Sequence, residues 1–305
     1  MDVKDPNTGN YVTIEGDELT FTTDAEGTVP TIGYMSCYEV PEVSLDGTGT
    51  SGYYSEKDDH WYRYNTTSSN RAIATHTFKA SNGNYVRNYT VMLDGDKKAP
   101  VWTAHVMHNS VWPDNDVRRN ESWRFDPAFD EGWQQSGISG SYSKGHLVAS
   151  DYRQTTKDQN RQTFYYSNQA PQWQTHFNDA IWQNLEKKVK AAAPTGRDTL
   201  YVVTGVLYEG TAKYVSGIQI PSHFYKCVMR CTFNTSGTIT AASGCAYIFD
   251  NEYIDETDPD DQDSNGVGTY RVTIDSIEER AGFNFFPRVP ENLQAAAENS
   301  KAKIW

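Results

Sequence analysis

The feature that most constrains the fold is one clear amphipathic helix among many short β-like runs. Between residues 178 and 193 the sequence reads NDAIWQNLEKKVKAAA, and Ile181, Leu185 and Val189 recur every four residues. This spacing gathers the apolar side chains on one helical face, and the PTG that follows predicts the end of the helix. We therefore expect an α+β fold in which an antiparallel sheet is flanked by helices.

Alternating and β-branched runs predict the strands of this sheet. Between residues 71 and 108 the runs RAIATHTFKA, NYVRNYTVML and VWTAHVMH are separated by SNGN and LDGDKKAP. The Asn-Gly and Asp-Gly pairs in these connectors are hairpin signals, so we expect an antiparallel meander. Further strands are expected at TLYVVTGVLY (199–208), KCVMRCTFN and CAYIFD, and a helix at IDSIEERAG that ends at Gly282 as a C-cap.

The first 55 residues are expected to be a β-rich extension. Short β-like runs reach residue 45, and DGTGTSG (46–52) then predicts a linker or an exposed loop. We divide the chain into an extension over residues 1–55 and a larger domain over residues 56–305. The extension is short for a core of its own, so it is either a small β domain or a set of strands added to the main sheet.

The chain is acidic, with a formal net charge of −13 over 305 residues. A wholly acidic surface repels nucleic acid, which argues against a protein that simply coats it. The charge is uneven, however, because residues 142–161 and 181–197 are locally basic while residues 250–263 hold eight acidic residues and no basic one. We expect the basic segments to hold a phosphate backbone and the acidic stretch to be a solvated loop.

A calcium site is the alternative for part of that acidic stretch. DQDSNG (261–266) matches the first half of a calcium-binding loop, with acidic or amide side chains at its first, third and fifth positions and glycine at its sixth. Val272 stands where such a loop needs a bidentate glutamate. A structural Ca²⁺ at the 261–266 loop is therefore at best half a site.

Four cysteines bear on the compartment, namely Cys37, Cys227, Cys231 and Cys245. Their even count and the hydroxyl- and Asn-rich surface favour disulfides in an oxidising compartment over four free thiols. No run approaches the roughly 18 apolar residues of a spanning helix, and MDVKDPNTGN has no apolar core. We expect no membrane span and a secreted, periplasmic or cell-surface protein whose leader has been removed.

Three neighbouring segments hold the residue types that phosphodiester hydrolysis requires: SKGH (143–146), FYYSNQAPQ (164–172) and FNDAIWQNLE (177–186). His146 suits a general base because imidazole titrates near neutral pH. Asn178 offers Mg²⁺ a hard, neutral oxygen. Glu186 lies about 12 Å further along the same helix and would reach the ion only through water. Lys144, beside the histidine, can bring positive charge to a phosphate.

These blocks resemble, in their order and content, the sugar-non-specific DNA/RNA endonucleases of the ββα-metal class, the family that includes mitochondrial endonuclease G. The resemblance covers roughly residues 60–297 and extends through YVVTGVLYEG, GIQIPSHFYKCV and IDSIEERAGFNFFPRVPENL. It implies that His146 is the general base, that Asn178 binds Mg²⁺ (or Mn²⁺) directly, and that Glu186 acts on the ion through water. It also implies an antiparallel core that carries a ββα-metal motif.

The resemblance implies roles for flanking residues as well. The family uses an arginine upstream of the histidine to stabilise the transition state, and Arg119 and Arg124 in RRNESWRFDP are both candidates. Asn168 matches an asparagine that supports the site. Together with Arg153 in GHLVASDYR and Lys190 after the glutamate, we assign it to substrate binding.

Two positions depart from the family pattern. Ser143 and Lys144 stand where the family has Asp-Arg before Gly-His. Lysine keeps the charge but loses the bidentate fork of arginine, and serine removes a carboxylate that can orient the site.

The interpretation that follows is a Mg-dependent endonuclease that hydrolyses DNA and RNA and leaves 5′-phosphate ends. Family members are often dimers, but no interface signal is visible in this sequence. The rival interpretation is a non-catalytic protein that binds nucleic acid or glycan on a degenerate nuclease scaffold. The intact set of His146, Asn178 and Glu186 argues against it.

Overall fold

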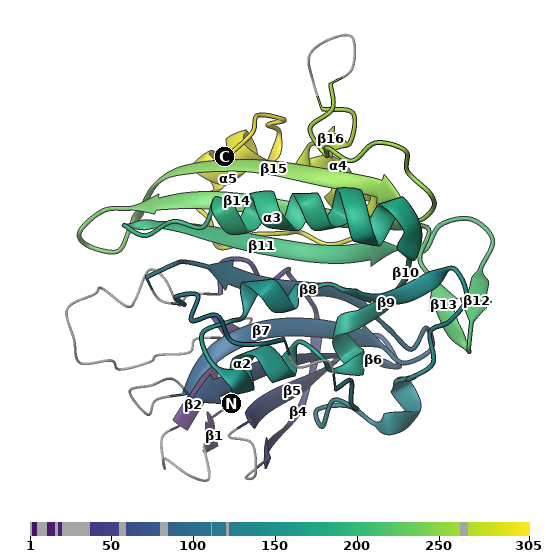
Figure 1. Cartoon of the computed structure of the whole chain (residues 1–305). Coiled ribbons are helices and arrows are strands. Elements are labelled where there is room, and N and C mark those ends of the chain that lie inside the picture. Colours follow the sequence, from purple (N-terminus) through teal and green to yellow (C-terminus); the bar gives the residue numbers. More distant parts are fainter. Residues whose placement is uncertain are drawn as a thin grey trace.

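A nine-stranded antiparallel sheet forms the centre of the computed structural model, with the strand order β16-β15-β14-β11-β8-β7-β6-β5-β4 (Figure 1). The structure describes residues 2–4, 11–15, 18–19, 37–54, 59–79, 85–110, 112–119, 122–262 and 268–305. Every neighbouring pair in the large sheet is antiparallel. Helices pack on this sheet, which confirms the expected α+β class.

The strands of the large sheet are β4 (Leu45–Tyr54), β5 (Asp59–Thr66), β6 (Arg71–Lys79), β7 (Tyr85–Asp94), β8 (Ala99–Met107), β11 (Asp198–Leu207), β14 (His223–Phe233), β15 (Ile239–Asp250) and β16 (Arg271–Val272). The smaller sheets are β1 (Asp2–Lys4) with β2 (Tyr11–Glu15) and β3 (Glu18–Leu19), β9 (Tyr142–His146) with β10 (Gln169–Trp173), and β12 (Lys213–Val215) with β13 (Ile218–Ile220). The expected meander is therefore confirmed as β6, β7 and β8, and the SNGN connector lies outside the described residues.

The helices are α2 (Lys157–Gln162), η5 (Gln174–Trp182), α3 (Gln183–Ala191), α4 (Ile274–Ala281) and α5 (Glu291–Glu298). Three single turns accompany them: η2 (Glu131–Trp133), η3 (Ser150–Tyr152) and η4 (Tyr166–Asn168). Gly282 ends α4 with a left-handed φ of 74°, as the C-cap prediction required. The predicted amphipathic helix is confirmed as the second half of η5 followed by α3.

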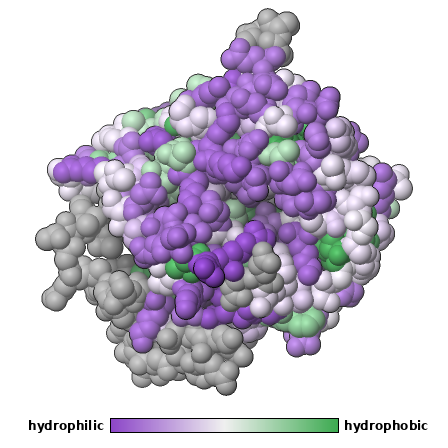
Figure 2. Space-filling model, in the orientation of Figure 1, coloured by the Kyte–Doolittle hydropathy of each residue, from purple (hydrophilic) through white to green (hydrophobic). Residues whose placement is uncertain are grey.

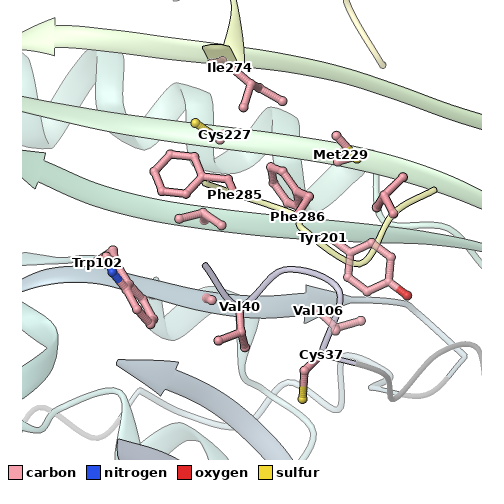
Figure 3. Close-up of a cluster of buried hydrophobic side chains, with 14 of the residues drawn as sticks. Cys37, Val40, Trp102, Val106, Tyr201, Cys227, Met229, Ile274, Phe285 and Phe286 are labelled. Carbon is pink, nitrogen blue, oxygen red and sulfur yellow. The ribbon is translucent and has the colours of Figure 1, made fainter. Parts of the chain in front are cut away.

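Alternation along β11 divides the core between the two faces of the sheet. Tyr201 and Val203 point to the face that α4 and the Phe285–Phe286 segment cover, as Figure 3 shows for Tyr201. Leu200 and Val202 point to the other face, where they meet the apolar side of α3. Successive side chains of a strand point to opposite faces, so one apolar run supplies both cores.

The predicted loop DGTGTSG is wrong, because residues 46–52 lie within strand β4. Gly49 pairs with Tyr64 of β5, and Gly52 pairs with Trp61. A Cβ added to either glycine would lie within 2.8 Å of the partner ring. Glycine in this strand therefore accommodates the close approach of aromatic side chains. For residues 45–54 the alternative of strands added to the main sheet is the correct one, while the domain division at residue 55 stays a prediction.

The expected disulfides are also wrong, since Cys37, Cys227, Cys231 and Cys245 are all free and buried. Cys227 and Cys231 lie on the face of β14 that packs on the C-terminal segment, whereas Cys245 belongs to the core beneath α3. The thiols act here as small apolar side chains. Burial raises the pKa of Cys231 and of Cys245 to about 12, so neither is a reactive thiolate at neutral pH.

Part of the acidic stretch is packed against the protein and is not a solvated loop. Asp260 is buried, accepts hydrogen bonds from Lys188 Nζ at 2.8 Å and Tyr247 Oη at 2.6 Å, and receives Trp305 Nε1 at 3.3 Å. Burial opposes ionisation of this carboxyl, but these hydrogen bonds hold its pKa at about 2. Lys188 also pairs with Asp258, so the acidic stretch neutralises part of the basic helix. The predicted calcium loop lies mostly outside the described residues.

Candidate active site

The site is built on two strands and a helix. Strand β9 pairs antiparallel with β10, so that His146 stands opposite Gln169 and Ser143 opposite Gln172. Gly145 lies against Gln172, whose Cβ would be 2.5 Å from a Cβ at this position. Glycine is therefore required at residue 145, because any side chain there would collide with Gln172 and separate β9 from β10. His146 follows as the last residue of β9. After β10 the chain continues directly into η5 and then α3.

A kink sets the start of the helix. His176 has a left-handed φ of 64°, and its N–H donates to Asp179 Oδ1 at 2.6 Å. The helical path begins after this residue, so Asn178 lies in the first turn, next to β9. Phe177, Ile181 and Leu185 are fully buried beneath the helix, which holds Asn178 and Glu186 on its outer side.

The outer side of this motif forms an open cleft of about 460 Å³. Its lining includes the four principal residues that the sequence predicted, namely Lys144, His146, Asn178 and Glu186. Arg119 and Lys187 add positive charge, while Asp151 and Asp179 add negative charge. The surface over α3 and β9 is mainly hydrophilic (Figure 2).

His146 lies at the inner wall of the cleft with 9% of its surface exposed. Its ring packs against Trp123 at 4.6 Å and against Phe164 at 5.0 Å between centroids. Burial and, secondarily, the nearby Arg119 lower the pKa of His146 to about 3. The imidazole is therefore neutral at pH 7 and has a lone pair with which to accept a proton.

Asn178 is oriented by two acceptors. Its amide Nδ2 donates to Ser143 Oγ at 2.8 Å and to Gln174 Oε1 at 3.1 Å, while the Ser143 hydroxyl donates to the carbonyl of Gln172 at 3.3 Å. Both amide hydrogens are thus engaged. The Oδ1 atom is then the free acceptor of the Asn178 side chain, and Asn178 lines the cleft. A hard neutral oxygen held in this way fits a Mg²⁺ ligand.

Glu186 lies above a buried lysine. Lys226, on β14, is fully buried, donates to Thr204 Oγ1 at 2.8 Å and has its ammonium 4.8 Å from the Trp182 ring centroid. Burial raises the pKa of Glu186, and the positive charge of Lys226 opposes that rise. A cation beneath the helix therefore favours the ionised form of Glu186, the form that can interact with a hydrated metal ion.

The structure separates the two arginine candidates. Arg119 lines the cleft, and its guanidinium lies 5.3 Å from the Phe164 ring centroid. Arg124 does not line the cleft, and its Nε donates to the carbonyl of Ser122 at 3.0 Å. Lys144 also lines the cleft, with its ammonium 5.6 Å from the Trp123 ring centroid.

The three residues that we assigned to substrate binding do not line the cleft and make contacts within the protein. Arg153 is 1% exposed, and its guanidinium donates to the carbonyls of Asn88 and Val106, both at 3.1 Å. Asn168 is fully buried. It accepts from the Val148 N–H at 2.9 Å and donates to the Val148 carbonyl at 3.0 Å, which holds the segment that follows His146.

Lys190 is likewise engaged by protein side chains, at the edge of the cleft. Its ammonium pairs with Asp114 and Asp151, each at 2.9 Å, and not with Glu186 one turn earlier. It does not line the cleft. The basic charge that the sequence places around this helix is therefore partly neutralised before any substrate arrives.

Sequence reasoning missed Gln174, Trp123 and Lys226. Lys226 had a visible signal, since a lysine inside the apolar run HFYKCVM has to be buried or placed at an edge. Gln174 precedes Asn178 by one helical turn, but the kink at His176 hides this relation from the sequence. Among the described residues one group of three carboxylates lies close together, at Asp275, Glu278 and Glu298, and it does not line the cleft.

The family model for DNA/RNA non-specific endonucleases matches residues 69–292. The chain therefore belongs to the DNA/RNA non-specific endonuclease family, which confirms the resemblance seen in the sequence. It is accordingly an enzyme that hydrolyses nucleic acid, and the non-catalytic alternative is set aside. The match includes β9, β10 and α3, the elements that carry the cleft.

Curated relatives agree with this membership. A nuclease of Nostoc sp. is 29% identical over 216 residues, which cover 69% of this chain and 75% of that protein. The nuclease of Serratia marcescens is 26% identical, covering 75% of this chain and 85% of its own length. Mitochondrial endonuclease G of Bos taurus is 30% identical over 53% of this chain and 52% of its own length.

A solved structure shares the fold. In a crystal structure of an EndoG/EndoGI complex, one chain aligns with a TM-score of 0.54 and 22% identity, over 67% of this chain and 85% of that one. This similarity supports the antiparallel core and its flanking helices. None of the described helices combines the length and the apolar character needed to cross a bilayer.

Proposed function

We propose that this enzyme is a Mg²⁺-dependent endonuclease that hydrolyses phosphodiester bonds of both DNA and RNA, with His146 as the general base and Asn178 as the metal ligand. The observation that carries the proposal is the meeting of His146, Asn178 and Glu186 in one cleft. In-line hydrolysis of a phosphodiester is served by a base for the attacking water and by a divalent cation, and these three residues supply the base and the oxygen donors for the cation.

His146 takes the proton from the attacking water. Its ring is neutral in the free protein because burial lowers its pKa to about 3. An anionic phosphate in the cleft favours the protonated ring and so raises the basicity of His146 once substrate is bound. The rings of Trp123 and Phe164 hold the imidazole in place while this occurs.

Asn178 and Glu186 would hold a hydrated divalent cation, for which Mn²⁺ is an alternative to Mg²⁺. The donor set fits, because the Asn178 oxygen is oriented by Ser143 and Gln174 and because Glu186 lines the same cleft. Mg²⁺ keeps most of its waters when few protein ligands bind it. Once bound, such an ion neutralises charge on the phosphate and on the leaving oxygen.

Arg119, Lys144 and Lys187 bind the phosphate. All three line the cleft. Arg119 stabilises the transition state, as the upstream arginine of the family does. Lys144 supplies the positive charge that the family places beside the histidine. Cleavage of the P–O3′ bond would leave 5′-phosphate ends.

The localisation and the oligomeric state remain predictions. The four free thiols remove the disulfide argument for export from the cytoplasm. We retain a secreted, periplasmic or cell-surface location as a proposal, to be tested by fractionation of the producing cells.

Digestion of plasmid DNA and of structured RNA, with and without Mg²⁺, tests the proposal. We expect the unaltered protein to cleave both with Mg²⁺ and His146→Ala to lose about 10²- to 10⁴-fold in rate. His223→Ala is the matched control, because His223 bonds to Asp250 at 2.8 Å and does not line the cleft. Undiminished cleavage by His146→Ala, or no cleavage by the unaltered protein, would overturn the mechanism.

A further inference from the structure

An aromatic group with one exposed ring contacts two residues of the cleft lining, Lys144 and His146. Phe125 is 40% exposed, and its ring stands nearly perpendicular to Tyr166, at 5.2 Å and 76°. Behind it, Tyr166 and Trp123 lie parallel, at 6.3 Å and 5°. Trp123 in turn contacts His146, so this aromatic group reaches from solvent to the catalytic base. We call Trp123, Phe125 and Tyr166 the aromatic platform.

The segment that carries Phe125 is held in place while its ring stays exposed. Its segment is held by backbone bonds on both sides of Arg124, whose N–H donates to the Phe164 carbonyl at 3.1 Å and whose carbonyl accepts from the Tyr166 N–H at 2.9 Å. Trp123 packs on Phe164 at 5.3 Å and so anchors the segment from within. The outer surface of the Phe125 ring is therefore available to a ligand.

A lysine of the cleft lies over two of the three rings of the platform. The Lys144 ammonium is 5.6 Å from the Trp123 centroid and 5.9 Å from the Tyr166 centroid, and Lys144 also lines the cleft. A ligand that presents an anion to Lys144 would thus have its neighbouring group beside the aromatic rings. A nucleotide has this form, with a phosphate joined through a sugar to a flat base.

The charge of the cleft favours stacking over long-range attraction. Arg119, Lys144 and Lys187 are balanced by Asp151, Asp179 and Glu186 in the lining. Before a divalent cation binds, such a cleft in a chain of net charge −13 attracts a phosphate backbone weakly. Base–aromatic stacking is a contact that adds affinity without depending on charge.

We propose that the aromatic platform stacks an unpaired nucleobase next to the scissile phosphate, so that the enzyme prefers single-stranded nucleic acid. This inference rests on the proposed function, since it places the scissile phosphate at Lys144 and His146. In a duplex both faces of each base are covered by its neighbours, and stacking on Phe125 would require that base to be displaced. An unpaired strand offers the base face directly.

Binding to oligonucleotides tests the platform without turnover, in the His146→Ala background. We expect Phe125→Ala to weaken binding of a single-stranded DNA about tenfold and to leave binding of the matching duplex unchanged. Phe125→Tyr should bind like the parent, because it keeps the ring. Tyr214→Ala is the matched control, since Tyr214 is 61% exposed on β12 and does not line the cleft.

An abasic scan identifies the stacked base. A single abasic site moved along the strand should reduce binding by the same factor at one position, and only when Phe125 is present. If Phe125→Ala binds single strands as well as its parent does, or if no abasic position depends on Phe125, the platform is refuted.

The two proposals fail separately. An enzyme that cleaves nucleic acid without any dependence on Phe125 refutes only the platform. A protein that binds single strands through Phe125 but does not cleave them supports the platform as a binding site and refutes the proposed function.

Discussion

The two faces of the central sheet are both covered by helices, yet they bury different chemistry. The hydrophobic cluster under α4 and the C-terminal segment consists of aromatic, aliphatic and thiol side chains, among them Tyr201, Cys227 and Phe285 (Figure 3). The face under α3 also has an apolar core, but Lys226, His105 and Arg153 are buried there beside it. One strand, β14, sends Cys227 to the first face and Lys226 to the second.

We infer that the face under α4 serves mainly the stability of the fold, whereas the face under α3 also serves the cleft. Apolar burial stabilises a fold, whereas burial of a charge costs free energy unless a partner compensates it. On the α3 face the buried cation lies beneath Glu186, whose carboxyl lines the cleft. The charge buried beside the opposite cluster is a self-contained ion pair, in which Arg87 bonds to Glu39 close to Cys37, and neither residue lines the cleft.

The largest effect is expected from Phe285→Ala on the apolar face. Phe285 is fully buried and stacks on Tyr225 at 5.8 Å. Loss of the ring should lower the free energy of unfolding by about 3–5 kcal/mol, as measured by urea unfolding, because a cavity remains. The turnover of the folded molecules should not change. A fall in turnover per folded molecule would show that the two faces are coupled.

A smaller effect, on activity and not on stability, is expected from Lys226→Met. Because Lys226 opposes the burial-induced rise in the pKa of Glu186, its removal raises that pKa further. Less Glu186 is then ionised at pH 7, so activity should fall at least about tenfold and recover as the pH rises. Stability should change little, since an apolar side chain replaces a buried cation.

A pH–rate profile checks this prediction. The acidic limb should move to higher pH in Lys226→Met. In a Glu186→Gln background, where this position cannot ionise, Lys226→Met should have no further effect. An unchanged profile would mean that Lys226 only fills space.

The smallest effect is expected from Ser143→Ala. This substitution removes one of the two acceptors that orient the Asn178 amide. Mn²⁺ affinity, measured by electron paramagnetic resonance or calorimetry, should fall about threefold to tenfold, as for the loss of one hydrogen bond. Ser143→Thr keeps the hydroxyl and should bind Mn²⁺ like the parent. Equal affinity of Ser143→Ala and the parent would mean that Gln174 alone orients the ligand.

Local patterns predicted much of the fold and the residue types of the site. The apolar period of α3, the meander and the cap at Gly282 depend on neighbours within a few residues, and all three are confirmed. The glycine-rich strand β4 was misread, because its glycines accommodate aromatic rings from β5 that the local sequence does not indicate. Asp260 was misread for the same reason, since Lys188, Tyr247 and Trp305 come from distant segments.

The sequence by itself determined the class of enzyme, because the blocks around His146, Asn178 and Glu186 are recognisable in order. It also determined which residues can accept a proton or bind a metal, since these are properties of the side chains. Only the tertiary structure placed Arg119 in the lining of the cleft and Arg124, Arg153 and Lys190 outside that lining, and it placed Ser143 against Asn178. The physical reason is that burial, ion pairing and amide orientation depend on contacts between segments far apart in the chain.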